Sequence, residues 1–113
     1  MADEASSGAR KKFAGPDRTF DAIKPGKSHH LAFTGTSAQT PAFATGTSII
    51  EVMCSTDAYI AIGADPTAAT TTNTTTSLFM PAGLTKYYAC AGVDKCAALQ
   101  SSAAGTMHIV EGA

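Results

Sequence analysis

The residues whose types could support metal chemistry are three histidines and three cysteines. His29 and His30 are adjacent, so on a strand their side chains face opposite ways and cannot easily share a metal ion. His108 could approach one of them only through the fold. No pair of Cys-x-x-Cys motifs is present, and the spacing of Cys90 and Cys96 is not a zinc signature. We therefore expect neither a metal site nor a cofactor.

The sequence also carries no pattern typical of nucleophilic or acid–base catalysis. Ser55, Asp57 and a histidine supply the residue types of a Ser-His-Asp triad, but no nucleophile-elbow motif accompanies them. The stretch after Gly63 lacks the glycine spacing and the lysine of a phosphate-binding loop. The carboxylates are scattered, and we assign most of them to turns or surface: Glu51, Asp57, Asp65, Asp94 and Glu111. We predict a structural or binding protein, not an enzyme.

The odd number of cysteines argues against a disulfide framework. Cys54 falls in an apolar stretch and is expected to be a small buried hydrophobe. Cys90 and Cys96 flank an expected turn, so a bridge between two strands is geometrically possible. That bridge stays an open alternative.

Composition excludes several classes of partner. The net charge of -1 gives no general attraction to nucleic acid or to an anionic membrane. No apolar run approaches the roughly 18 residues of a membrane helix, and the first residues lack the apolar segment of a secretory signal. Charged residues make up 15% of the chain, below the usual value of about 25%. Such a surface suits a protein packed against others, or a solvated surface rich in threonine.

The segment from Thr47 to Gly63 holds the densest run of β-branched and aromatic residues. A short polar break, Ser55-Thr56-Asp57, divides it, so we predict a β-hairpin. The core positions predicted in its two strands are Ile50, Val52, Ile60 and Ile62.

Other strands are expected on both sides of this segment. The stretch from His29 to Phe33 is one, and residues 34–46 read as a loop with a short edge strand near Phe43. Residues 64–77 form a long polar loop, and strands are expected at 78–80, 84–90, 95–101 and 106–111. About seven short strands without helical periodicity predict an all-β fold, a small antiparallel β-sandwich of jelly-roll-like type over residues 29–113.

Residues 1–28 are expected to form an extended, flexible N-terminal arm, with a turn at Lys24–Lys27. Either the arm becomes ordered on a partner, or it is a plain disordered terminus. The candidate contact residues are the basic cluster and three apolar anchors: Arg10, Lys11, Lys12, Phe13, Phe20 and Ile23.

The C-terminal half resembles small virion proteins of tailed bacteriophages. The residues that carry this resemblance are the runs DAYIAIGADPTA from Asp57, LFMPAG from Leu78, the pair Tyr87-Tyr88, and SAAGTMHIVE from Ser102. Members of that group resemble capsid cement or decoration proteins with compact β-folds. The resemblance implies a non-enzymatic protein of the capsid surface, assembled in the cytoplasm of a bacterial host.

The implied partners are the major capsid protein and further copies of this chain, as a dimer or a trimer, with no role for nucleic acid or membrane. One alternative is a head–tail or tail component of the virion, such as a fibre or adaptor. A second is a carbohydrate-binding β-module, whose site would be formed by the long threonine-rich loop at 64–77 with Tyr59, Tyr87 and Tyr88. This alternative requires an exposed cluster of the three tyrosine rings.

Overall fold

A computed structural model describes residues 10–15, 18–70 and 77–113, with side chains described for 24–70 and 77–113. The described residues form ten β-strands and no helix. The strands are β1 (Arg10–Gly15), β2 (Arg18–Ile23), β3 (Pro25–Phe33), β4 (Ala38–Gln39), β5 (Ile49–Cys54), β6 (Ala58–Gly63), β7 (Leu78–Met80), β8 (Lys86–Ala89), β9 (Lys95–Gln100) and β10 (Gly105–Gly112).

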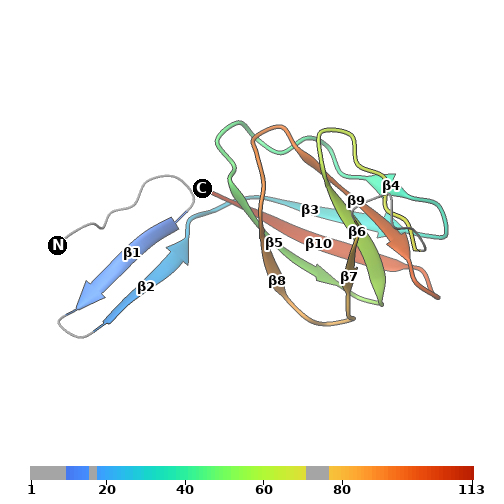
Figure 1. The fold of residues 1–113 in the computed structure, drawn as a ribbon, viewed down its shortest axis with the longest axis horizontal. Coiled ribbons are helices and arrows are strands. Elements are labelled where there is room, and N and C mark those ends of the chain that lie inside the picture. Colours follow the sequence, from blue (N-terminus) through green and yellow to red (C-terminus); the bar gives the residue numbers. More distant parts are fainter. Residues whose placement is uncertain (1–9, 16–17, 71–76) are drawn as a thin grey trace.

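The chain from β3 to β10 folds back on itself as one long hairpin whose tip is the segment between β6 and β7. Strand β3 pairs with β10, β4 with β9, β5 with β8 and β6 with β7, all antiparallel. Rolling this hairpin up gives two sheets of four strands, ordered β3-β10-β5-β8 and β4-β9-β6-β7 (Figure 1). This is the strand order of a jelly roll, so the expected fold class is confirmed.

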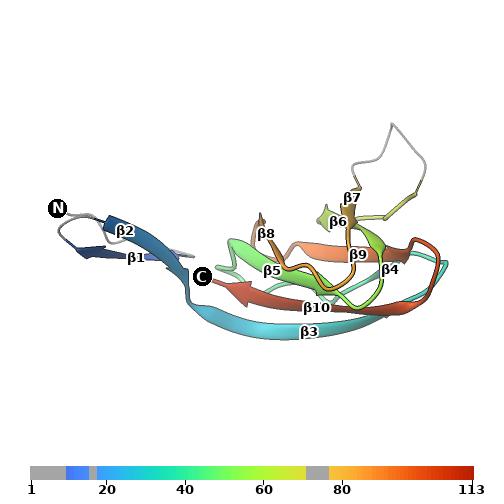
Figure 2. The ribbon, with the colours of Figure 1, turned by 90° about the horizontal axis from the view of Figure 1, so that it is seen from below.

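The two sheets stack face to face (Figure 2), and their inward-facing side chains form one apolar core. The alternation of buried and less buried residues in β5 follows the period of two expected for a strand with one face in the core. Ile50, Val52 and Ile60 are fully buried as predicted, while Ile62 is half-buried at the margin of the core.

The prediction of a central hairpin is wrong, although both of its strands exist. β5 and β6 belong to different sheets, and the break at Ser55-Thr56-Asp57 carries the chain from one sheet to the other. A strand, a short polar break and a second strand produce the same local pattern in both arrangements. The rest of the chain decides the pairing. β5 forms hydrogen bonds with β8, and β6 forms hydrogen bonds with β9, so β5 and β6 do not pair with each other.

The N-terminal segment also differs from the expected single extended arm. β1 and β2 pair as an antiparallel hairpin, with Phe13 opposite Phe20 and Gly15 opposite Arg18. Pairing satisfies backbone groups that a lone extended chain would leave to water. The predicted turn at Lys24–Lys27 is wrong, because β3 begins at Pro25, opposite Gly112. Proline is tolerated there, since the first residue of an edge strand need not donate a ladder hydrogen bond.

The turn between β8 and β9 contains a backbone conformation that its residue disfavours. Val93 has a φ of 62° and is 60% exposed. A β-branched side chain in this left-handed region crowds the backbone, and the cost is about 1–2 kcal/mol. The turn is nevertheless held by the Asp94 N–H, which donates to the Ala91 carbonyl at 3.1 Å.

Val93→Asn is therefore expected to stabilise the protein by about 1 kcal/mol, because asparagine tolerates a positive φ. Thermal unfolding followed by circular dichroism checks this, with a Tm rise of a few degrees expected. Val93→Ala keeps a Cβ but removes the branch, so its Tm should lie between that of the natural sequence and that of Val93→Asn. A lower Tm for Val93→Asn contradicts the assignment of strain.

Candidate functional site

A buried carboxylate organises the end of the sandwich nearest the β1–β2 hairpin. Glu111 lies on the inward face of β10 and is 1% exposed. Its Oε1 accepts hydrogen bonds from the Thr47 hydroxyl at 2.6 Å and from the Ala44 N–H at 2.9 Å. Its Oε2 lies 2.5 Å from Nε2 of His29 on β3. One side chain thereby joins two strands to the loop that precedes β5.

The hydrogen bonds decide the ionisation of this carboxyl. Burial acts to raise the pKa of Glu111, but the donors on Thr47, His29 and Ala44 outweigh it, so the pKa lies below its ordinary value. The charged form is therefore the one that the fold stabilises. The sequence analysis counted Glu111 among scattered carboxylates, most of them assigned to turns or surface, and did not identify it as buried. The signal that could have found it is the alternation Met107, Ile109, Glu111, which puts all three on one face of the strand.

A small cavity of about 220 Å³ opens beside this cluster. It is lined by residues 24–27 at the start of β3, by residues 44–47 and by residues 111–113 at the C-terminal end of β10. Glu111, Lys24 and Lys27 are its charged lining residues. The Lys24 carbonyl accepts a hydrogen bond from the Ala113 N–H at 3.1 Å. The cluster therefore fixes the point where the β1–β2 hairpin joins the sandwich.

The fold separates His29 from His30 and brings His30 to His108. His30 and His108 are register partners on β3 and β10, and their ring centroids lie 4.5 Å apart with an interplanar angle of 72°. Both side chains project from the outer face of the sheet β3-β10-β5-β8, opposite to the face that carries Ile109 and Glu111. Within residues 24–70 and 77–113, no group of three or more His, Cys, Asp or Glu side chains gathers closely enough to hold a metal ion.

The residues considered for a Ser-His-Asp triad have structural partners instead. Ser55 Oγ accepts a hydrogen bond from the Thr106 N–H at 2.9 Å, and Asp57 Oδ1 accepts one from the Ala82 N–H at 2.8 Å. A Cβ at Gly105 would lie 2.8 Å from the hydroxyl of Ser55 and closer still to that of Thr56, so a larger residue where β10 starts would displace these side chains. These contacts fix the crossing from β5 to β6.

The three tyrosines do not form one binding surface. Tyr59 lies on the outer face of the second sheet, where its ring meets Phe79 edge to face with centroids 5.4 Å apart. Tyr87 is 54% exposed on the outer face of the first sheet. Tyr88 points between the sheets, and its hydroxyl donates to Sδ of Met80 at 3.7 Å. The exposed cluster required of a carbohydrate-binding module built on these rings is therefore not formed.

All three cysteines are free thiols. Burial raises the pKa of Cys54 and of Cys90 to about 11, and that of Cys96 to about 12. The bridge between Cys90 and Cys96 is not formed. Cys90 follows β8 in one sheet, and Cys96 lies on β9 in the other. The thiols act as small apolar groups and not as nucleophiles at neutral pH.

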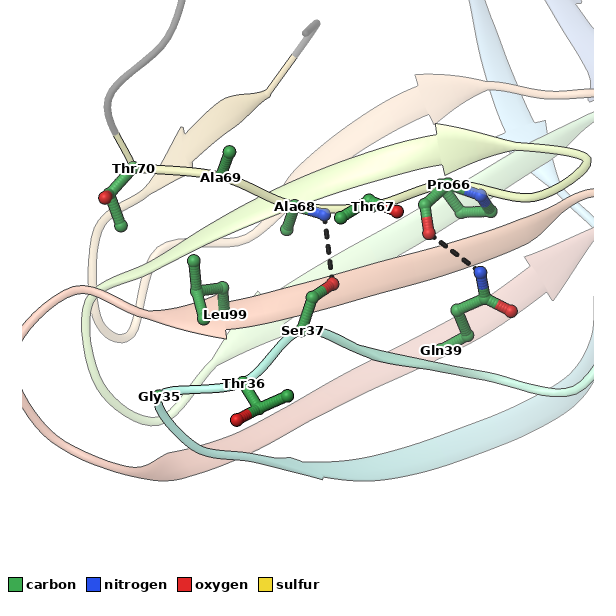
Figure 3. A pocket seen from close by; sticks show the side chains of 10 residues that line it. All are labelled: Gly35, Thr36, Ser37, Gln39, Pro66, Thr67, Ala68, Ala69, Thr70 and Leu99. Atoms are coloured by element: carbon green, nitrogen blue, oxygen red, sulfur yellow. Dashed lines mark hydrogen bonds between the residues drawn. The ribbon is translucent and has the colours of Figure 1, made fainter.

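An open groove of about 640 Å³ lies between the segment before β4 and the first part of the β6–β7 connection (Figure 3). Two of its polar side chains hydrogen-bond to the backbone on the opposite side of the groove. Ser37 Oγ accepts from the Ala68 N–H at 3.0 Å, and Gln39 Nε2 donates to the Pro66 carbonyl at 2.8 Å. Leu99 of β9 also lines the groove, and none of its lining residues is charged. This arrangement fixes the connection over the sheet and presents no catalytic constellation.

The six candidate contact residues of the arm all fall on the β1–β2 hairpin. The register places Arg10 opposite Ile23, Lys11 opposite Ala22 and Lys12 opposite Asp21. The hairpin joins neither sheet of the sandwich and lies beyond one end of it in both views (Figure 1 and Figure 2).

Comparisons with protein-family models, with curated proteins and with solved structures gave no match. The fold and its contacts therefore carry the functional argument. The described part of the chain contains no helix that is long and apolar enough to cross a membrane.

Proposed function

We propose that this chain is a non-enzymatic structural protein of a bacteriophage particle, a cement or decoration protein that binds the outside of the major capsid protein shell and stabilises it. The observation that carries the proposal is the β1–β2 hairpin, which is attached to the jelly roll but belongs to neither of its sheets. A two-stranded hairpin is only marginally stable by itself in water. A hairpin of this kind is suited to a contact surface on another protein.

Two further observations support a structural role. The jelly roll is an architecture used by viral capsid proteins, although it is also used by lectins and cupins, so the fold alone does not decide the function. The side chains of Glu111, Ser55 and Asp57 accept hydrogen bonds from groups of the same chain, so they contribute to holding the fold together. The resemblance of residues 57–111 to small phage virion proteins points the same way. Within the particle, this protein is expected to associate as a dimer or a trimer.

A head–tail or tail component of the same particle is the alternative function. The two roles differ in the number of copies per virion. Quantitative mass spectrometry of purified virions, relative to the major capsid protein, separates them. Hundreds of copies support a shell protein, a dozen or fewer support the neck or the tail, and absence from the particle overturns both.

Deletion of residues 1–23 is expected to abolish binding to capsids and to leave the sandwich folded. The deletion keeps Lys24, whose carbonyl binds the Ala113 N–H, so the edge of the sandwich stays intact. We expect at least a roughly hundredfold loss of affinity, because the proposed contact residues are removed together. The assay is cosedimentation with capsids of the parent phage that lack this protein.

The matched variants test the basic cluster separately. Replacing Arg10, Lys11 and Lys12 together with serine should weaken binding and make it less sensitive to salt. Lys27→Ser removes a positive charge from β3 outside the hairpin and should leave binding unchanged. Full binding by the deleted protein, with an unchanged Tm, contradicts the assignment of the hairpin as the contact element.

A further inference from the structure

We propose that His30 and His108 form a two-histidine site for a divalent transition-metal ion of the Ni²⁺ or Cu²⁺ type on the outer face of the sheet β3-β10-β5-β8. The proposal is independent of the capsid assignment, since it rests on one pair of side chains and their strands. Imidazole nitrogen is a preferred ligand of these ions.

The strand register holds the two rings together. His30 and His108 are directly opposite each other on neighbouring antiparallel strands. Residues so placed project from the same face of the sheet, and their side chains are in contact range. The inward neighbours Met107 and Ile109 are buried in the core, which fixes the outward orientation of His108. The backbone thereby positions both imidazoles before any ion arrives.

The separation of the rings fits coordination at a right angle. A metal–nitrogen bond of about 2.0–2.1 Å puts the ion roughly 3.2 Å from the centre of each imidazole ring. Two rings bound at about 90° then have centroids roughly 4.5 Å apart, whereas tetrahedral ligands require about 5.2 Å. The observed separation is 4.5 Å. This separation equals that of neighbouring ligands in the square-planar or octahedral geometry preferred by Cu²⁺ and Ni²⁺. The rings meet at an interplanar angle of 72°, and rotation of each ring about its Cβ–Cγ bond sets which edge faces the ion.

The surroundings leave room for the rest of the coordination sphere. His30 is exposed and His108 is half-buried, so water has access to the pair. Met53 on β5 is the register partner of His108 on its other side, which places a thioether in the same row across the sheet. A site with two protein ligands, and with its other coordination positions open to water, is expected to bind the ion with moderate affinity and to release it readily.

Binding would connect an edge strand to a central one. β3 is the outermost strand of its sheet and continues directly from the β1–β2 hairpin, while β10 lies between β3 and β5. An ion held by both histidines resists separation of these strands. Since the unfolded chain does not hold the two rings together, the ion binds the folded state preferentially and raises its stability.

The test is titration of the tag-free, chelator-treated full chain with Ni²⁺ by isothermal calorimetry, because Ni²⁺ does not oxidise the free thiols. One ion per chain is expected to bind. His30→Asn and His108→Asn should each lower the affinity for Ni²⁺ roughly hundredfold. When both histidines are present, the ion bound to one ring meets the second ring at a high effective concentration, and either substitution removes this advantage. Ni²⁺ should raise the Tm of the natural sequence and not that of either variant.

Thr106→Ala is the matched control, since it alters the same face of β10 two residues before His108 without removing a nitrogen ligand. Its affinity for Ni²⁺ should equal that of the natural sequence. The proposal is overturned if no saturable binding is seen, or if both histidine variants bind Ni²⁺ as tightly as the natural sequence does.

Discussion

Glu111→Ala is expected to lower the free energy of unfolding by about 3–5 kcal/mol. The substitution removes the acceptor for three groups at once. The Thr47 hydroxyl and the Ala44 N–H lie 2.6 and 2.9 Å from Oε1, and His29 Nε2 lies 2.5 Å from Oε2. Each group left buried without a partner costs about 1–3 kcal/mol. Urea unfolding at pH 7 measures the loss.

Glu111→Gln is the control for this prediction, because it keeps the side-chain volume and one carbonyl acceptor. It should cost less than the alanine substitution, about 1–3 kcal/mol. Glu51→Ala, on the outer face of β5 and only half-buried, should change stability by about 0.5 kcal/mol or less. Equal stability of Glu111→Ala and the natural sequence would show that the cluster contributes nothing.

The carboxylate of Glu111 also makes the stability of the folded protein depend on pH. Because the pKa of Glu111 is lower in the folded chain than in the unfolded chain, its contribution is fully present above the unfolded pKa, about 4.3. The contribution is lost as pH falls from that value through the folded pKa. The stability difference between the natural sequence and Glu111→Gln should therefore shrink from pH 6 towards pH 3. A difference that stays constant over this range contradicts the assignment.

Phe43→Ala is expected to cost about 3–5 kcal/mol, as for other large aromatic side chains removed from a core. Phe43 is 1% exposed although it lies outside the strands, in the connection between β4 and β5. Its N–H donates to the Asp94 carbonyl at 2.7 Å, and its carbonyl accepts from the Val93 N–H at 3.1 Å. Its ring centroid lies 5.7 Å from that of His29. The loop is thereby held to the β8–β9 turn while its ring fills the core.

Phe79→Ala removes the same number of atoms from a residue that is 43% exposed, and so serves as the matched control. We expect it to cost about 1 kcal/mol, mainly from the contact with Tyr59. Urea unfolding of both variants provides the comparison. If Phe43→Ala costs no more than Phe79→Ala, the ring of Phe43 does not act as a core residue.

The sequence was informative wherever a local pattern has one physical meaning. The density of β-branched and aromatic residues located β5 and β6, and the alternation of side chains along a strand placed Ile50, Val52 and Ile60 in the core. Turn residues were equally direct. The turn at Pro81-Ala82-Gly83 is built from residue types that favour turns, and Gly83 has a φ of 75°, which glycine adopts without cost. Composition and the even spacing of the strands were enough for the β-sandwich.

No local sequence pattern predicts the burial of Phe43. It lies in a stretch of alanine, threonine and glycine that is typical of an exposed loop. Its environment is set by the Asp94 and Val93 backbone groups, about 50 residues away in sequence. Such contacts have no local pattern, because the chain brings them together only after the sheets have formed.

The sequence by itself determined the all-β class, most strands and the alternation that builds the core. The tertiary structure alone decided which strands pair: β5 with β8 and β10, not with β6. It also decided that Glu111 meets His29 and Thr47, and that His30 meets His108 and not its neighbour His29. The physical reason is that the direction of a side chain follows from the local backbone. The partner that the side chain meets is set by the register between segments about 65–80 residues apart, and this register depends on the packing of the whole chain.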